Sequence, residues 1–170
     1  MAEASSAIPS GVYPYLSVKG GKAAIDFYTR AFGATEEYRA YGEDGERIMH
    51  ARFRVNGAAI LLSDDFPEFR GGTPAPPPAG VTIHLEVDDA DAWWERALKA
   101  GAEPIMPLAD QFWGDRYGQL KDPFGHTWSI GAPIKRRSEA HLADLAVALD
   151  ADDPGAAMAH GLIERAGVAH

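Results

Sequence analysis

The sequence contains no cysteine. Disulfide bonds, thiolate metal ligands and a cysteine nucleophile are therefore excluded. No apolar run reaches the roughly 18 residues that a membrane-spanning helix needs. Residues 1–10 also lack the basic and apolar regions of a secretory signal. From these absences we expect a cytoplasmic protein with no membrane partner.

Positive charge is scarce as well. The chain has 16 Lys and Arg against 25 Asp and Glu, a net charge of −9. That balance argues against nucleic acid and against an anionic membrane surface as partners. Hydrophobic residues make up 46% of the 170 residues, which is typical of a folded globular chain with a real core. The acidic excess is concentrated in residues 138–170.

The same order of signals occurs twice, over residues 12–57 and 81–128. Each copy begins with the alternation of a half-buried strand, continues with an amphipathic helix that a glycine ends, and closes with turn-separated β segments. The expected helices span residues 23–32 and 90–100 and end at Gly33 and Gly101. We interpret the pattern as a duplicated βαβββ module.

The later strands are expected at residues 36–41, 47–55 and 58–63, and at 103–106, 115–120 and 126–131. Asn56-Gly57 is a strong hairpin signal. The predicted organisation is a disordered arm (1–10), a first module (11–66), a Pro/Gly linker (67–80), a second module (81–134) and an acidic helical C-terminal extension (135–170). Two interpretations of the extension stay open, docking onto a subunit and a loosely ordered tail.

Two motifs carry a family resemblance. Asp26-Phe27-Tyr28 precedes Phe32-Gly33-Ala34, and Trp113-Gly114 is followed by Gly118 and Asp122-Pro123-Phe124-Gly125-His126. Over residues 11–133 the chain resembles the glyoxalase/bleomycin resistance/dioxygenase group, the vicinal oxygen chelate superfamily, and most of all its PhnB-like branch. The resemblance implies an α+β fold in which tandem βαβββ modules form a cup-shaped, curled mixed sheet. It also implies a homodimer, and leaves open whether modules pair within one chain or across two.

Strand alternation predicts which side chains face the cup. Flat rings there would stack on a planar or cationic ligand. Arg52 or Arg116 would hold a carboxylate or phosphonate, whereas Asp110, Asp115 and Glu86 would suit a cation. Phe112 is expected in the core. The predicted ligand-binding residues are Tyr13, Tyr15, His50, Arg52, His84, Glu86, Trp113, Arg116, Tyr117 and Ser129.

The metal positions that the resemblance implies fall on Tyr13, on Leu62 or Ser63, on Thr82 and on Ser129. None is a histidine or a carboxylate, and serine and threonine hydroxyls are poor ligands for divalent ions. We therefore predict no metal and no other cofactor. A displaced divalent-metal site made of His50, His84 and Glu86 is the alternative, because two histidines and one carboxylate suit iron.

The resulting hypothesis is a homodimeric protein of the glyoxalase/bleomycin resistance type that binds a small molecule without the usual metal. The alternative is a glyoxalase-type lyase or isomerase, or a dioxygenase-like enzyme, acting on a small oxygenated substrate. In that alternative His84 is the candidate general base and Glu86 orients it. A structural or regulatory dimer is a third interpretation, which rests only on the C-terminal extension.

Overall fold

The structure, a computed structural model, describes residues 11–134. The predictions of a disordered arm over residues 1–10 and of a helical extension over residues 135–170 lie outside the described residues. Within residues 11–134, no helix has both the length and the apolar character needed to cross a membrane.

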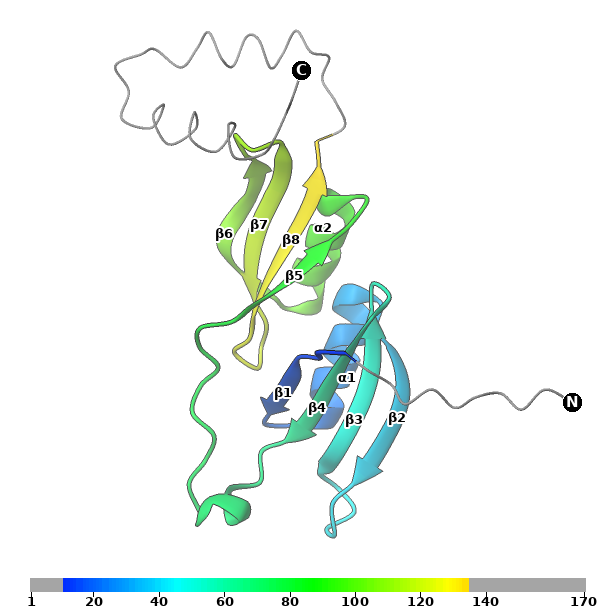
Figure 1. The fold of residues 1–170 in the computed structure, drawn as a ribbon, viewed down its shortest axis with the longest axis vertical. Coiled ribbons are helices and arrows are strands. Elements are labelled where there is room, and N and C mark those ends of the chain that lie inside the picture. The colour runs from blue at the N-terminus through cyan, green and yellow to red at the C-terminus, as the bar shows by residue number, and fades with distance from the viewer. Residues whose placement is uncertain (1–10, 135–170) are drawn as a thin grey trace, which may run out of the picture. The chain divides into compact units, whose positions relative to one another are not determined.

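The first module has the predicted βαβββ order (Figure 1). It consists of β1 (Tyr15–Val18), α1 (Gly21–Phe32), β2 (Thr35–Tyr41), β3 (Ile48–Val55) and β4 (Ala58–Asp64). The strands form one mixed sheet in the order β1-β4-β3-β2, with β1 parallel to β4 and the other pairs antiparallel. A short 3-10 helix, η1 (Pro67–Arg70), begins the linker.

The second module repeats that order with β5 (Thr82–Glu86), α2 (Ala90–Ala100), β6 (Glu103–Asp110), β7 (Asp115–Lys121) and β8 (Thr127–Pro133). Its sheet runs β5-β8-β7-β6, again with the first strand parallel to the last. The duplicated topology is therefore confirmed. Over residues 11–134 the two sheets are separate, because strands of one module pair only with strands of the same module.

The two helices begin in different ways. Asp89 caps α2 locally, since its carboxylate accepts a hydrogen bond from the backbone N–H of Ala92 at 3.0 Å. In α1 the cap comes from the end of β4: Asp64 Oδ1 accepts from the N–H groups of Gly20 and Gly21 at 2.9 and 2.8 Å. Asp64 Oδ2 also accepts from the N–H of Ile48 at 2.7 Å. Asp64 thus ties α1 to two strands of its own sheet.

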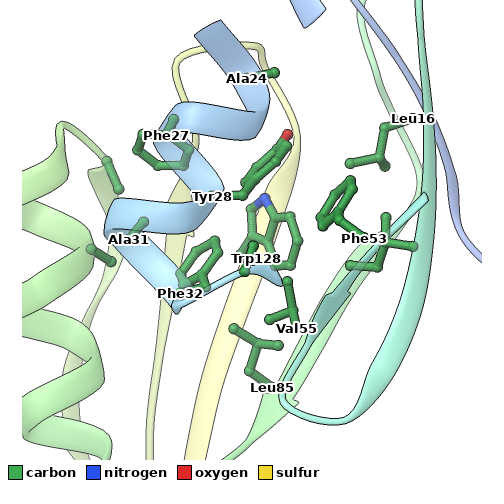
Figure 2. Close-up of a cluster of buried hydrophobic side chains, with 14 of the residues drawn as sticks. Leu16, Ala24, Phe27, Tyr28, Ala31, Phe32, Phe53, Val55, Leu85 and Trp128 are labelled. Carbon is green, nitrogen blue, oxygen red and sulfur yellow. The ribbon is translucent and has the colours of Figure 1, made fainter. Parts of the chain in front are cut away.

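An aromatic cluster forms the centre of the core (Figure 2). Tyr28 of α1 stacks on Phe53 of β3, with ring centroids 5.4 Å apart and planes 12° apart. Tyr28 also lies 5.4 Å from the ring of Trp128, which belongs to β8 of the second module. Phe32 is closer still to Trp128, at 4.6 Å. The modules therefore share one core, in which each buried aromatic side chain contributes a large apolar area.

A buried set of hydrogen bonds to Asp122, which we call the polar joint, reinforces this shared core. Asp122, in the turn between β7 and β8, accepts hydrogen bonds at Oδ2 from the Tyr28 hydroxyl at 2.8 Å and from the Trp128 indole N–H at 2.9 Å. Its Oδ1 accepts from the N–H groups of Phe124 and His126, both at 2.9 Å. These bonds fix the β7–β8 turn of the second module against α1 of the first.

The protonation states of Asp122 and Tyr28 in the polar joint follow from their surroundings. Burial alone would raise the pKa of the Asp122 carboxyl. The imidazole of His126, whose Nδ1 is 3.6 Å from Oδ2, and the hydrogen bonds from Trp128 and Tyr28 outweigh burial and hold that pKa below its usual value. Burial, and then the charge of Asp122, raise the pKa of Tyr28 far above its usual value. Tyr28 is thus a neutral donor to an ionised Asp122.

Candidate ligand-binding faces

Each sheet packs one face against the helices and turns the other outward, as strand alternation predicts. In β1, Leu16 and Val18 are 4% and 2% exposed, whereas Tyr15 between them is 52% exposed. We call the outward face of the first sheet the first face, defined by Tyr13, Tyr15, Tyr38, His50 and Arg52. The second face is the outward face of the second sheet, defined by His84, Trp113, Tyr117, Gln119 and Ser129.

On the first face, an imidazole lies between two tyrosines. The Tyr15 hydroxyl is 3.0 Å from His50 Nδ1. The His50 ring is 5.7 Å from the Tyr15 ring and 6.1 Å from the ring of Tyr38. Tyr38 was not among the predicted site residues. It reaches this face because the pairing of β2 with β3 shifts between Glu36 and Tyr38, an irregularity that periodicity does not reveal.

Arg52 places a cation beside these rings. Its guanidinium carbon lies 5.1 Å from the centroid of the Tyr13 ring, a cation–π distance. Its Nε donates to Glu37 at 2.8 Å, and Arg54 Nε donates to the other oxygen of Glu37 at 2.5 Å. The hydrogen bond from Arg54 holds the pKa of Glu37 below its usual value against the opposing effect of desolvation, and the hydrogen bond from Arg52 adds a smaller lowering effect. Glu37 therefore stays charged and offsets part of the positive charge of Arg52.

On the second face, His84 is held from three sides. Its Nδ1 is 2.8 Å from the Ser129 hydroxyl. Its ring is 6.0 Å from the Tyr117 ring, with the planes 27° apart. A Cβ atom on Gly131 would come within 2.9 Å of His84 Cε1. Glycine at position 131 thus leaves room for the imidazole.

Aromatic rings extend the second face beyond His84. Trp113 lies 5.8 Å from Tyr117 in an edge-to-face contact, and Phe112 lies 5.0 Å from Trp113. The Tyr117 hydroxyl accepts a hydrogen bond from Gln119 Nε2 at 2.9 Å. Phe112 is 67% exposed, so the expectation that it packs in the core is wrong. It lies in the turn between β6 and β7, outside the alternation of either strand.

Two further predictions need correction. Arg116 does not line the second face: it alternates with Tyr117 along β7, and its guanidinium is held by Asp91 of α2 at 2.8 Å and by Asp110 at 2.9 Å. Glu86 does not orient His84, because Ser129 makes that contact. The Glu86 side chain is exposed, and its backbone carbonyl accepts from Asn56 Nδ2 at 2.6 Å.

The residues at the implied metal positions do not fit a divalent ion. Leu62 is fully buried, which leaves Ser63 as the outward residue of β4. The set is then Tyr13, Ser63, Thr82 and Ser129, and the Ser129 hydroxyl is already bonded to His84. The displaced set is split, since His50 is on β3 and His84 and Glu86 are on β5 of the other sheet. Over residues 11–134, no three His, Asp or Glu side chains are grouped so that one ion could be shared.

One hollow of the described residues lies away from both faces. It measures about 500 Å³ and is lined by Lys19, Lys22, Arg47 and Asp64, among others, at the start of α1. Its lining mixes both charges, and the first helical N–H groups already bond to Asp64. We therefore place the candidate site on the two faces, where the aromatic and hydrogen-bonding side chains are clustered.

The fold and these outward faces define a class of protein built from paired βαβββ modules. Residues 12–130 match the family model of the Glyoxalase/Bleomycin resistance protein/Dioxygenase superfamily, and the chain belongs to that superfamily. Rv0887c of Mycobacterium tuberculosis is 44% identical over 146 residues, covering 84% of each chain. Protein YjdN of Escherichia coli is 28% identical over 140 residues, covering 69% of this chain and 91% of its own.

Solved structures share the fold. Protein PA1353 of Pseudomonas aeruginosa has a TM-score of 0.60 and 29% identity, covering 74% of this chain and 98% of its own. FosX of Listeria monocytogenes, a fosfomycin resistance protein solved with Mn(II) and sulfate, has a TM-score of 0.55 and 19% identity. That match covers 74% of this chain and 93% of FosX. At that identity the likeness to FosX shows the fold alone.

Proposed function

We propose that this chain binds a small molecule on the aromatic and polar residues of its outward faces, without a divalent metal. The observation that carries the proposal is the exposure of large rings beside hydrogen-bonding groups. Tyr15, Tyr38 and Trp113 are 52%, 56% and 49% exposed. Such rings present flat apolar area next to the imidazoles of His50 and His84, a combination that suits a planar ligand.

We also propose that the binding unit is a homodimer, as the resemblance implies, and that it is cytoplasmic, as we expect from the composition. The support from the described residues is that the two faces are the outer surfaces of separate sheets. A second copy would set another sheet opposite each face and enclose the ligand. Sedimentation equilibrium is expected to give twice the 18.3 kDa mass of the chain. A mass of one chain at micromolar concentration would contradict this part of the proposal.

The binding proposal is tested with a set of aromatic fragments titrated into the full chain in the presence of EDTA. We expect some fragments to bind, with amide shifts concentrated on the residues of the two faces. Trp113→Ala is expected to weaken binding about tenfold, because one stacking partner is lost.

Phe69→Ala is the control, since Phe69 is also an exposed ring, 71% exposed against 49% for Trp113, but belongs to η1 and not to a face. It is expected to leave affinity unchanged. Binding that vanishes in EDTA and returns with stoichiometric Mn²⁺ or Zn²⁺ would contradict the metal-independent proposal.

One observation favours a catalytic alternative. His84 is fixed by Ser129 on an exposed face, and a positioned imidazole is the commonest acid or base in enzymes. In that alternative the chain is a glyoxalase-type lyase or isomerase acting on a small oxygenated substrate. If His84→Ala turns over such a substrate as fast as the unaltered protein, this role for His84 is eliminated.

A further inference from the structure

The environment of His84 fixes which ring nitrogen carries the proton. Ser129 is only 2% exposed, and among residues 11–134 its hydroxyl has one hydrogen-bond partner, His84 Nδ1 at 2.8 Å. A hydroxyl has one hydrogen to donate. If Nδ1–H donated to Ser129, the serine hydrogen would be buried without an acceptor, which is costly. Ser129 therefore donates to Nδ1, and the neutral imidazole carries its hydrogen on Nε2.

Tyr117 supplies a second donor next to His84. Its hydroxyl oxygen accepts from Gln119 Nε2 at 2.9 Å, so its own hydrogen is available to another acceptor. The Tyr117 and His84 rings are nearly parallel, with centroids 6.0 Å apart. The second face thus presents two neighbouring donors, Nε2–H and Oη–H. Trp113 stands edge-on to Tyr117 and can border a planar ligand.

The charged side chains near His84 and Tyr117 favour neutral over negatively charged ligands among those that accept hydrogen bonds. Glu86 follows His84 on the same side of β5, and Glu86, Gly131 and Tyr117 are in register across three strands. Arg116, the arginine of this module that was predicted to hold a carboxylate, is bonded to Asp91 and Asp110. A carboxylate ligand would meet the negative charge of Glu86 without a compensating arginine. A neutral carbonyl oxygen accepts the same two hydrogen bonds without that repulsion.

We infer that the second face recognises a neutral carbonyl group on a planar ligand, through His84 Nε2–H and Tyr117 Oη–H. In this inference, which rests on the proposed function, Ser129 is the positioning residue that sets the tautomer of His84. One consequence concerns the catalytic alternative. A neutral His84 with its proton on Nε2 has no free lone pair on the exposed side, so it is a donor and neither a general base nor a metal ligand there.

The first test needs no ligand. Nitrogen-15 spectra of the full chain at pH 8, where an ordinary histidine is neutral, report the tautomer of each ring. The His84 signal is assigned by its loss in His84→Gln. We expect the Nε2–H tautomer in the unaltered chain. Ser129→Ala is expected to introduce a measurable Nδ1–H population, and Ser129→Thr, which retains a hydroxyl, is expected to restore the original spectrum.

Thr127→Ala is the control, because Thr127 lies on the same strand and side as Ser129 but pairs with Thr82. It is expected to leave the His84 signal unchanged. A His84 ring that is Nδ1–H in the unaltered chain would overturn the inference, whatever the ligand proves to be.

The second test measures affinity for three probes: coumarin, chroman, which lacks the carbonyl, and coumarin-3-carboxylate, which adds a negative charge. Coumarin is expected to bind at least about tenfold more tightly than either, the fold-change of roughly one net hydrogen bond. His84→Phe keeps an aromatic ring in place but leaves Tyr117 Oη–H as the remaining donor, so it is expected to reduce that preference for coumarin.

The outcomes separate the two proposals. Equal binding of coumarin and chroman, or tighter binding of the carboxylate, would overturn the carbonyl assignment and leave the binding function standing. No binding of any probe at millimolar concentration would overturn the binding function together with the carbonyl assignment.

Discussion

The two modules share a backbone plan and a reciprocal contact between their helices. Arg30 of α1 donates to the carbonyl of Ala100 at the end of α2, at 3.2 Å, and Arg96 of α2 donates to the carbonyl of Ala31 near the end of α1, at 2.8 Å. Each arginine thus lies against the negative end of the other helix dipole. The duplication therefore extends from topology to one specific interaction.

The faces, in contrast, have diverged. Tyr15 and His84 hold equivalent places, since each lies on the first strand of its module and pairs in parallel with the last strand. Both faces join a hydroxyl to the Nδ1 of an imidazole. On the first face the hydroxyl is on the first strand and the imidazole, His50, is on β3. On the second face the first strand carries the imidazole. The comparison shows that the backbone frame and the chemistry of the faces vary independently.

The turns before the last strands should differ most in their contribution to stability. In the first module this turn is Asn56-Gly57, with φ values of 48° and 81°, whereas in the second it carries the buried Asp122. Asp122→Ala would leave four donors without their acceptor. We expect a loss of about 3–5 kcal/mol in the free energy of unfolding, measured by urea denaturation. A loss below about 1 kcal/mol would show that the joint does not hold the modules together.

The helix caps offer a smaller contrast. Asp64→Ala removes a buried acceptor of three backbone N–H groups and is expected to cost about 2–4 kcal/mol. Asp89→Ala removes an exposed cap with one such bond and is expected to cost about 1 kcal/mol. The same denaturation series measures both variants. Equal losses would mean that the long-range cap of α1 acts like an ordinary local one.

Acid should affect the joint through Asp122. Its pKa is lowered in the folded state, so its ionisation stabilises the fold. That stability is complete above the ordinary aspartate pKa of about 4 and is lost as the pH falls through the lower, folded value. Unfolding free energies measured from pH 7 to pH 2 should fall less steeply in Asp122→Asn. Identical slopes in the two proteins would assign the acid sensitivity to other carboxylates.

The sequence predicts the order of the helices and strands and their buried and outward sides well, because these depend on local patterns. Strand alternation placed Tyr15 and His84 outward, and the glycines after each helix marked its end. The features it missed depend on contacts distant in sequence. The bulge that turns Tyr38 onto the first face arises from the pairing of β2 with β3. Asp64 and Asp122 act on groups 43 and 94 residues away, a distance that no motif spacing records.

Elemental analysis of the untagged protein, before and after chelation and beside His84→Ala, tests the central claim most directly. The account predicts less than about a tenth of a metal ion per chain, because no set of strong ligands is grouped on either face among the described residues. Stoichiometric iron, zinc, nickel or manganese that is lost in His84→Ala would contradict it. Such a result would mean that His84 binds a metal, and would replace metal-free binding with metal chemistry.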